Sequence, residues 1–177
     1  MNLKSLVRSI PDYPRPGIVF RDITPLLESP SALRFMADTL VDRVQDMNID
    51  KVAVVESRGF LLGGIIAYML DAGLVIMRKK GKLPFRTHSV EYTLEYGTDA
   101  LEVHEDSIVS GERVLLHDDL LATGGTIMAA ASLVRVSRGT IVGASFIIEL
   151  GFLKGRGRLM EHGIDEIASL IGYDGKV

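Results

Sequence analysis

Two adjacent aspartates, Asp118 and Asp119, stand shortly before a loop of small residues, Ala122-Thr123-Gly124-Gly125-Thr126. An apolar stretch precedes the acids, and an alanine-rich stretch that predicts a helix follows the loop. Glycines let backbone N–H groups turn toward one point, and a helix N-terminus adds positive charge, so the loop suits a phosphate monoester. Carboxylates repel phosphate but suit hydroxyl groups or a hydrated magnesium ion. The stretch therefore predicts a ribose 5-phosphate, with phosphate on the loop and hydroxyls on the acids.

A plainer interpretation is a strand-end turn followed by the entry to a helix, and a bare acid pair with two glycines would mostly be that. The full order of apolar strand, acid pair, two aliphatic residues, loop and helix is more specific. It differs from the nucleotide-binding pattern G-x-x-x-x-G-K and from the dinucleotide pattern G-x-G-x-x-G. We therefore expect a sugar-phosphate site of another kind.

Four further motifs carry candidate chemistry. In "ESRGF" (56–60), Arg58 follows a predicted strand, where its planar guanidinium would suit a pyrophosphate. "RKKGKLP" (78–84) concentrates four cations in one turn, and "LEYG" (94–97) lies at the tip of a predicted hairpin. The fourth motif, "GIVFRD" (17–22), contains Phe20, which the residues alone predict to be a core phenylalanine. The plain alternatives for the first three motifs are solvated surface charges.

The composition is that of one soluble globular domain of 177 residues. The net charge of −3 argues against a nucleic-acid partner, and the absence of cysteine excludes disulfides and thiolate chemistry. Four histidines lack the paired spacing of zinc ligands, so we expect no metal site made of protein groups alone.

Residues 60–77 are almost long enough to span a bilayer, but Asp71 interrupts them, and inserting it near mid-membrane would cost roughly 2.5–3.5 kcal/mol. We expect a helix, a turn and a strand there, no signal peptide and no membrane partner.

Continuous apolar runs predict the strands that position these motifs. The expected strands are 51–56, 73–78, 113–117, 140–150 and 166–172. A helix is expected after Ser29-Pro30 as far as Met47, and helices between the strands predict a mainly parallel α/β sheet covered on both faces. Such a sheet binds ligands at the carboxyl ends of its strands. Residues 88–105 predict an antiparallel hairpin standing off the main sheet, and the proline-rich residues 9–27 predict a mostly irregular lead.

The stretch "VLLHDDLLATGGT" resembles the phosphoribosyl pyrophosphate (PRPP) signature of the type I phosphoribosyltransferases. Similar segments follow the family's order over most of residues 9–126, and beyond about residue 150 the match is looser, mainly through "LKGRGRL". The segments are "IPDYPRPGIVFRDITPLL", "ESRGFLLGG", "RKKGKLP" and "YTLEYGTDALEVHEDSI". By this resemblance the chain is identified as a member of the type I phosphoribosyltransferases. The resemblance implies one domain over 1–177 with the family fold, an N-terminal hood (1–30) and a β-hairpin catalytic flap (79–107).

The resemblance also implies a reaction of purine salvage. The 5-phosphoribosyl group of PRPP would pass to adenine, giving AMP and pyrophosphate, without a protein nucleophile. Mg²⁺ would be bound mainly through PRPP and pyrophosphate, and the protein would be a cytoplasmic homodimer. Two alternatives stay open: another base, such as xanthine or orotate, and a non-catalytic PRPP-binding regulator. A regulator would be expected to carry an added DNA-binding domain, for which this chain has no spare length.

Catalytic roles come from the same resemblance. Arg58 and Lys82 would contact the leaving pyrophosphate, and Arg78 would reach across a dimer interface to the neighbouring site. Glu95 and Tyr96 would close over the reacting centre, with Glu95 acting at adenine N7 or at the ribose. The loop holding Arg58 often carries a cis peptide bond in this family.

The base site is likewise implied by the resemblance. Phe20 and Leu120 would cover the two faces of adenine, and backbone groups of Val19 and Arg21 would read its Watson–Crick edge. Two departures from the family pattern stand out. His117 replaces an aliphatic residue before the acid pair, and we expect it on the packed side of the strand, without a catalytic role. "LVRVSRGT" (133–140) replaces the usual helix ending, which concerns local packing only.

Overall fold

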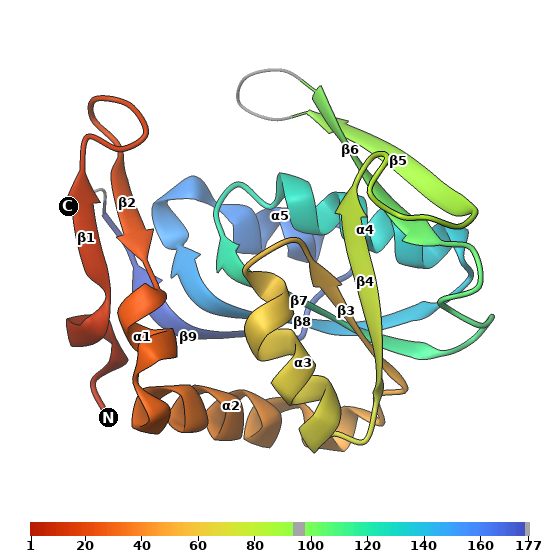
Figure 1. Ribbon diagram of the computed structural model, residues 1–177, viewed down its shortest axis with the longest axis horizontal. Helices are drawn as coiled ribbons and strands as arrows, with labels where there is room; N and C mark the ends of the chain where they lie inside the picture. The colour runs from red at the N-terminus through yellow and green to blue at the C-terminus, as the bar shows by residue number, and fades with distance from the viewer. Residues whose placement is uncertain (94–97, 176–177) are drawn as a thin grey trace.

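The computed structural model describes residues 1–93 and 98–175, and within these a seven-stranded sheet has the order β5-β6-β4-β3-β7-β8-β9 (Figure 1). Five strands pair in parallel: β3 (Lys51–Val55), β4 (Gly73–Lys79), β7 (Arg113–Leu121), β8 (Thr140–Leu150) and β9 (Ile167–Tyr173). β5 (Thr87–Thr93) and β6 (Thr98–His104) are antiparallel. The predicted α/β class with a mainly parallel sheet is confirmed.

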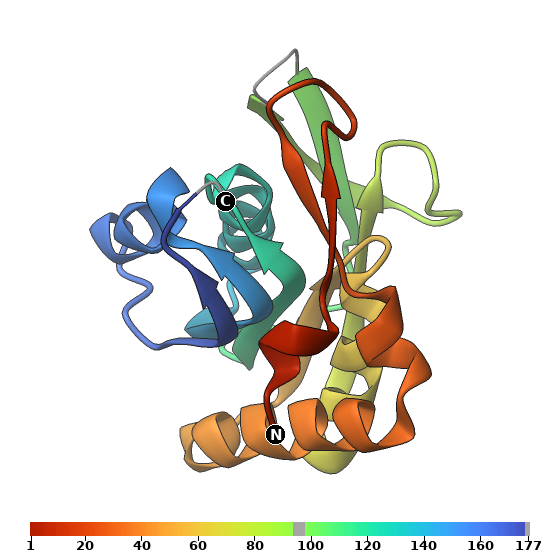
Figure 2. The same cartoon turned by 90° about the vertical axis from the view of Figure 1, so that its left-hand side faces the viewer.

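Helices cover both faces of the sheet, because its central strands are apolar on both sides. Val52 and Val54 of β3 pack toward α2 (Pro30–Val44) and α3 (Gly59–Met69). Their neighbours Ala53 and Val55 pack toward α4 (Gly125–Val136) and α5 (Gly155–Glu161). Figure 2 shows α2 and α4 on opposite sides of the strands. The alternation of a strand explains why one apolar run feeds two cores.

The long helix α2 begins as its sequence predicts. The Ser29 side chain accepts a hydrogen bond from the Ala32 N–H at 3.3 Å, and Pro30 occupies the first helical position. The helix ends at Val44, and a 3-10 turn, Gln45–Met47, completes the predicted span. Residues 60–77 likewise form a helix, a turn and a strand, and no helix among the described residues is long and apolar enough to cross a membrane.

The lead segment is more ordered than its prolines predict. After a 3-10 turn, Leu3–Leu6, it contains β1 (Arg8–Pro11), β2 (Val19–Asp22) and α1 (Thr24–Glu28). The strands β1 and β2 pair antiparallel as a separate sheet, called here the N-terminal ribbon. The prediction of a mostly irregular lead was wrong because the prolines occupy a strand end, the connecting loop and the first turn of α1, where no ladder N–H is lost.

Two boundaries also differ from the prediction. The hairpin of β5 and β6 does not stand off the sheet, because β6 pairs with β4 through Arg78↔Glu102 and Lys79↔Leu101. The strand β7 continues to Leu121 instead of ending at residue 117, because its pairing with β8 extends to that residue. The acid pair therefore lies within a strand, not in a loop after it.

Candidate active site

A cavity of about 370 Å³ lies at the carboxyl ends of β3 and β7, where ligands bind in parallel α/β sheets. All five predicted phosphate-loop residues line it, together with both aspartates, Leu120 and Arg58. The remaining lining residues are Val55, Glu56, Ser57, Lys79, Tyr92, Asp99, Leu101, Leu121 and Ile127. The structure thus brings the main predicted groups into one space.

The phosphate loop connects β7 directly to the N-terminus of α4. Gly124 has a φ of +81°, a conformation that glycine adopts readily, and α4 begins at the next residue. Behind the loop, a Cβ on Gly155 of α5 would collide with the Ala122 carbonyl oxygen. The loop is therefore held from behind while its amides and the positive end of α4 meet the cavity, an arrangement that suits a phosphate group.

The two aspartates have different surroundings. Asp118 Oδ1 accepts a hydrogen bond from the Asp119 N–H at 2.8 Å, and Asp119 Oδ2 lies 2.5 Å from Arg58 Nε. Desolvation, and then the charge of Asp119, raise the pKa of Asp118 well above its ordinary value. Carboxylate oxygens accept hydrogen bonds from sugar hydroxyls. The pair is therefore suited to a ribose.

Arg58 lies where β3 passes into α3. The preceding peptide bond, between Glu56 and Ser57, is cis. The Arg58 side chain is 45% exposed, and its guanidinium carbon lies 5.5 Å from the centroid of the Phe20 ring. Arg58 therefore bridges the acid pair and the N-terminal ribbon, and an anion entering the cavity can reach it.

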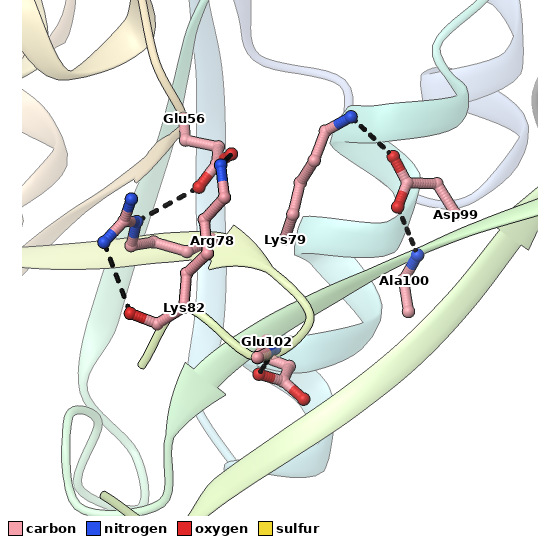
Figure 3. A network of polar contacts seen from close by, with 8 residues as sticks. Glu56, Arg78, Lys79, Lys82, Asp99, Ala100 and Glu102 are labelled. Atoms are coloured by element: carbon pink, nitrogen blue, oxygen red, sulfur yellow. Dashed lines mark hydrogen bonds and ion pairs between the residues drawn. The ribbon is translucent and has the colours of Figure 1, made fainter. Parts of the chain in front are cut away.

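Glu56, which the sequence analysis did not single out, holds two predicted site residues (Figure 3). Its carboxylate lies 3.1 Å from Arg78 Nε and 2.5 Å from Lys82 Nζ. Burial would raise the pKa of Glu56, but hydrogen bonds from Lys82, Lys79 and Arg78 lower it overall. Lys82 and Arg78 thus gather beside the cavity without lining it. The missed signal was the acid that opens the "ESRGF" motif itself.

The end of β4 and the hairpin contribute further groups that the sequence analysis did not assign to the site. Lys79 Nζ lies 2.8 Å from Asp99 Oδ2, and both residues line the cavity. Tyr92 of β5 also lines it, and burial raises the pKa of the Tyr92 hydroxyl, which has Thr126 as a hydrogen-bond partner. For Tyr92, the alternation of polar and apolar residues along the hairpin was the available signal. Glu95 and Tyr96 lie outside the described residues.

The proposed base site lies on the N-terminal ribbon. Val19, Phe20 and Arg21 form part of β2, and the Tyr13 ring packs edge-on against Phe20 at 5.3 Å between centroids. Phe20 is only partly buried, so the plain interpretation of a core phenylalanine is wrong. Leu120 lines the cavity and is partly buried as well, whereas Val19, Phe20 and Arg21 are not among the lining residues.

His117 is fully buried on the α3 side of β7, where we expected it to pack. Its Nδ1 lies 2.8 Å from Ser145 Oγ, and burial lowers the pKa of His117 to about 4. A Cβ on Gly63 of α3 would lie 3.0 Å from the His117 ring. His117 is therefore a neutral packing residue beneath the acid pair.

Metal-ligating side chains do not gather in threes within the described part of the chain. The two aspartates could supply at most a partial oxygen ligand set for a hard divalent cation such as Mg²⁺. This donor set fits an ion held mainly by a bound ligand's own oxygens.

Residues 22–164 match the phosphoribosyl transferase domain family. An adenine phosphoribosyltransferase of Gloeobacter violaceus is 53% identical over 161 residues, which cover 91% of this chain and 94% of that protein. The adenine phosphoribosyltransferase of Rubrobacter xylanophilus is 52% identical over 171 residues, which cover 97% of this chain and 91% of that protein. These matches extend through the fold and the site together.

Solved structures agree with these matches. The crystal structure of the adenine phosphoribosyltransferase from Thermoanaerobacter pseudethanolicus aligns with a TM-score of 0.92 at 47% identity, covering 97% of this chain and 98% of that one. The enzyme of Saccharomyces cerevisiae, solved in complex with adenine and an imino-altritol bisphosphate, aligns with a TM-score of 0.84 at 37% identity, covering 89% and 92%.

Proposed function

We infer the reaction from the family: this chain belongs to the adenine phosphoribosyltransferases of the phosphoribosyl transferase domain family. It is a purine-salvage enzyme that transfers the 5-phosphoribosyl group from PRPP to adenine, giving AMP and pyrophosphate. The observation that carries this function is the cavity in which Asp118, Asp119 and the 122–126 loop meet Arg58. A sugar phosphate with an anionic leaving group matches that combination.

The groups around the cavity suggest how each part of PRPP is held. We propose that the 122–126 loop binds the 5-phosphate through its amides and the α4 N-terminus, and that Asp118 and Asp119 hold the ribose hydroxyls. The C1–O bond to pyrophosphate then breaks as adenine N9 bonds to C1, through a ribo-oxocarbenium-like state, and the N9 proton of adenine is released to solvent. Holding the reactants in line supplies most of the acceleration.

Arg58 and Lys82 are proposed to receive the negative charge that develops on pyrophosphate. Support comes from their present partners, because each already binds a carboxylate, Asp119 and Glu56, at 2.5 Å. Both side chains are nearly half exposed, at 45% and 47%, so an anion can compete for them. Mg²⁺, when bound through PRPP, would neutralise further charge on the leaving group.

The hood (1–30) and the flap (79–107) are proposed as the parts that enclose the reactants. Phe20 would cover one face of adenine and Leu120 the other, with backbone groups of Val19 and Arg21 on its edge. Closure of the flap, with Glu95 and Tyr96, would exclude water from PRPP. A Glu95→Gln variant with unchanged kcat and KM would remove Glu95 from this role.

A homodimer is proposed from an exposed apolar surface on α3 and β4. A groove there is lined by Phe60, Leu74, Ile76 and Arg78, among others, and Leu74 and Ile76 are 43% and 42% exposed. On α3, Tyr68 is 86% exposed. A monomer would leave this surface in water, whereas a second copy would cover it and bring Arg78 close to a neighbouring site.

We also propose a cytoplasmic location, because PRPP carries too much charge to cross a membrane unaided.

The decisive experiment is a panel of bases with PRPP and the purified protein. Adenine should give AMP and pyrophosphate, and withholding Mg²⁺ should abolish turnover. Guanine, hypoxanthine, xanthine and orotate serve as comparisons. Turnover with one of these and none with adenine would mean a different base, and PRPP binding without pyrophosphate release would mean a non-catalytic sensor.

A further inference from the structure

Tyr173, the last residue of β9, connects the C-terminal strand to the N-terminal ribbon. Its side chain is buried, with 6% of the residue exposed, and two cations lie against its ring. The Arg21 guanidinium carbon lies 4.1 Å from the ring centroid and Lys4 Nζ lies 4.4 Å from it. Lys4 Nζ also donates to the Gly172 carbonyl oxygen at 2.9 Å. In Figure 2 the backbone of β9 stands apart from the ribbon, so it is the long Arg21 side chain that reaches the Tyr173 ring.

The ribbon needs such contacts because it forms a sheet of its own. A two-stranded hairpin is marginally stable in water, and here its strands are only four residues each. Within the ribbon, Arg21 Nη1 also donates to Ser9 Oγ on the partner strand.

Arg21 and Phe20 are neighbours on β2, so their side chains point to opposite sides of the ribbon. Phe20 lies near Arg58, whose guanidinium carbon is 5.5 Å from its ring centroid, at the edge of the cavity. Arg21 lies against Tyr173 on the other side. The strand is thus held between the site and β9, and a shift of Arg21 would move Phe20 as well.

We propose that Tyr173 is a positioning residue for adenine, holding Arg21 by a cation–π contact so that Phe20 stays at the base site. The inference rests on the proposed function, in which Phe20 covers adenine. The proposed 5-phosphate site, the 122–126 loop, belongs to β7 and α4 and not to the ribbon, so the contact should affect the base more than the sugar phosphate. The specific consequence is a larger change in KM for adenine than in KM for PRPP.

The test replaces Tyr173 by Leu, which keeps apolar volume but removes the aromatic face, and by Phe, which keeps that face. Tyr173→Leu should raise KM for adenine about fivefold, the effect of losing one such contact. KM for PRPP and kcat at saturation should stay within about twofold by the same scale. Tyr173→Phe should behave like the wild type. Hydrogen exchange should rise in residues 8–22 of the Leu variant and not in α4.

Arg21→Met removes the cation and leaves the buried ring in place, so it decides the question even if Tyr173→Leu fails to fold. It should raise KM for adenine similarly, and the double variant should be no worse than either single one. An unchanged KM for adenine in Arg21→Met, or an equal rise in both KM values, would overturn the role of Tyr173. Failure of the proposed function would show separately, as a wild-type protein that forms no AMP.

Discussion

Asp118 and Asp119 are neighbours in the chain but differ in what surrounds them. Asp119 lies against Arg58, whereas Asp118 is desolvated and its pKa is raised. A raised pKa means that the folded state binds the proton more tightly than the unfolded state does. Ionised Asp118 therefore destabilises the fold, increasingly as the pH rises above the ordinary value of 3.8. This residue is retained at the expense of stability, as expected of a functional group.

Asp118→Asn should accordingly raise the melting temperature at pH 7 while lowering turnover on the order of 100-fold, the effect of a misplaced reactant. The gain in stability should shrink as the pH is lowered toward 4, and thermal melts across pH 4–8 would measure it. Asp119→Asn is the matched control, because it removes the partner of Arg58 and should not stabilise. Equal melting temperatures for wild type and Asp118→Asn at pH 7 would contradict the assignment.

The pKa shift of Glu56 is opposite in direction to that of Asp118. Its pKa is lowered, so its pairs with Lys82 and Arg78 stabilise the fold above the ordinary value of 4.5, and this stabilisation is lost as the pH falls through the lower folded value. Glu56→Gln should reduce the free energy of unfolding by about 1 kcal/mol at pH 7, since both cations are partly solvated. Urea denaturation at pH 7 and near pH 4 would measure the difference, with the exposed Glu161→Gln as control. A loss that persists unchanged at low pH would rule out this ion-pair explanation.

At the scale of elements, periodicity predicted what depends on one strand or helix alone. The apolar runs of β3, β4, β8 and β9 and the Ser29-Pro30 cap of α2 are local signals, and the structure follows them. The end of β7 could not be predicted from the local sequence, because it is fixed by the pairing of Leu120 with Ile148 and of Leu121 with Glu149 on β8. The same reason explains the missed N-terminal ribbon and the edge pairing of β6.

The site residues also divide into those predicted from local sequence and those that depend on long-range contacts. Residue types and order predicted the phosphate loop and the acid pair, because both come from one continuous stretch. Glu56, Lys79 and Asp99 were missed because their importance comes from partners distant in the sequence, such as the Lys82 that Glu56 binds. Long-range ion pairs have no periodic signature that one sequence could reveal.

The helix α5 supports the phosphate loop from behind and is itself held by an ion pair. Arg156 donates to both carboxylate oxygens of Glu149, from Nε at 2.8 Å and from Nη2 at 2.6 Å. This places Gly155 so close to Ala122 that a Cβ would collide with its carbonyl oxygen. The loop can therefore keep its shape only while residue 155 has no side chain.

Gly155→Ala should displace the loop and raise KM for PRPP about tenfold, which corresponds to roughly 1.4 kcal/mol. Gly157→Ala, on the same helix, is the matched control, because a Cβ there meets no atom of the described residues within 4 Å. It should leave kinetics unchanged and stabilise the helix by up to about 1 kcal/mol. Steady-state kinetics with PRPP varied, beside thermal melts, separate the two. Similar PRPP kinetics in both variants would show that α5 does not shape the loop.

At the scale of the whole molecule, the cavity is assembled from three parts of the chain. The parallel strands supply the acid pair, the phosphate loop and Lys79, the hairpin supplies Tyr92 and Asp99, and the N-terminal ribbon stands at the edge, where Phe20 lies against Arg58. The central strands are buried on both faces and the ribbon forms a separate sheet, whereas the hairpin pairs with β4 and also packs Leu101 and Val103 into the core shared with α4. A floor made by the sheet, with a separately folded ribbon at its edge, is suited to admitting one substrate and then enclosing it.

The exposed apolar surface on α3 and β4 gives the last prediction, which concerns assembly. Ile76→Lys places a charge in the groove lined by Leu74 and Arg78, so it should convert the proposed dimer into monomers. Light scattering coupled to size exclusion should give the mass of two chains for the wild type and of one for the variant. Val136→Lys, at the end of α4, is the control, because Val136 is 54% exposed but lies on a helix of the opposite face and should leave the dimer intact.

If Arg78 acts across the interface, monomeric Ile76→Lys should also show a raised KM for PRPP. A monomeric wild type that turns over adenine would show that each chain carries a complete site, and Arg78 would then act within its own chain beside Glu56.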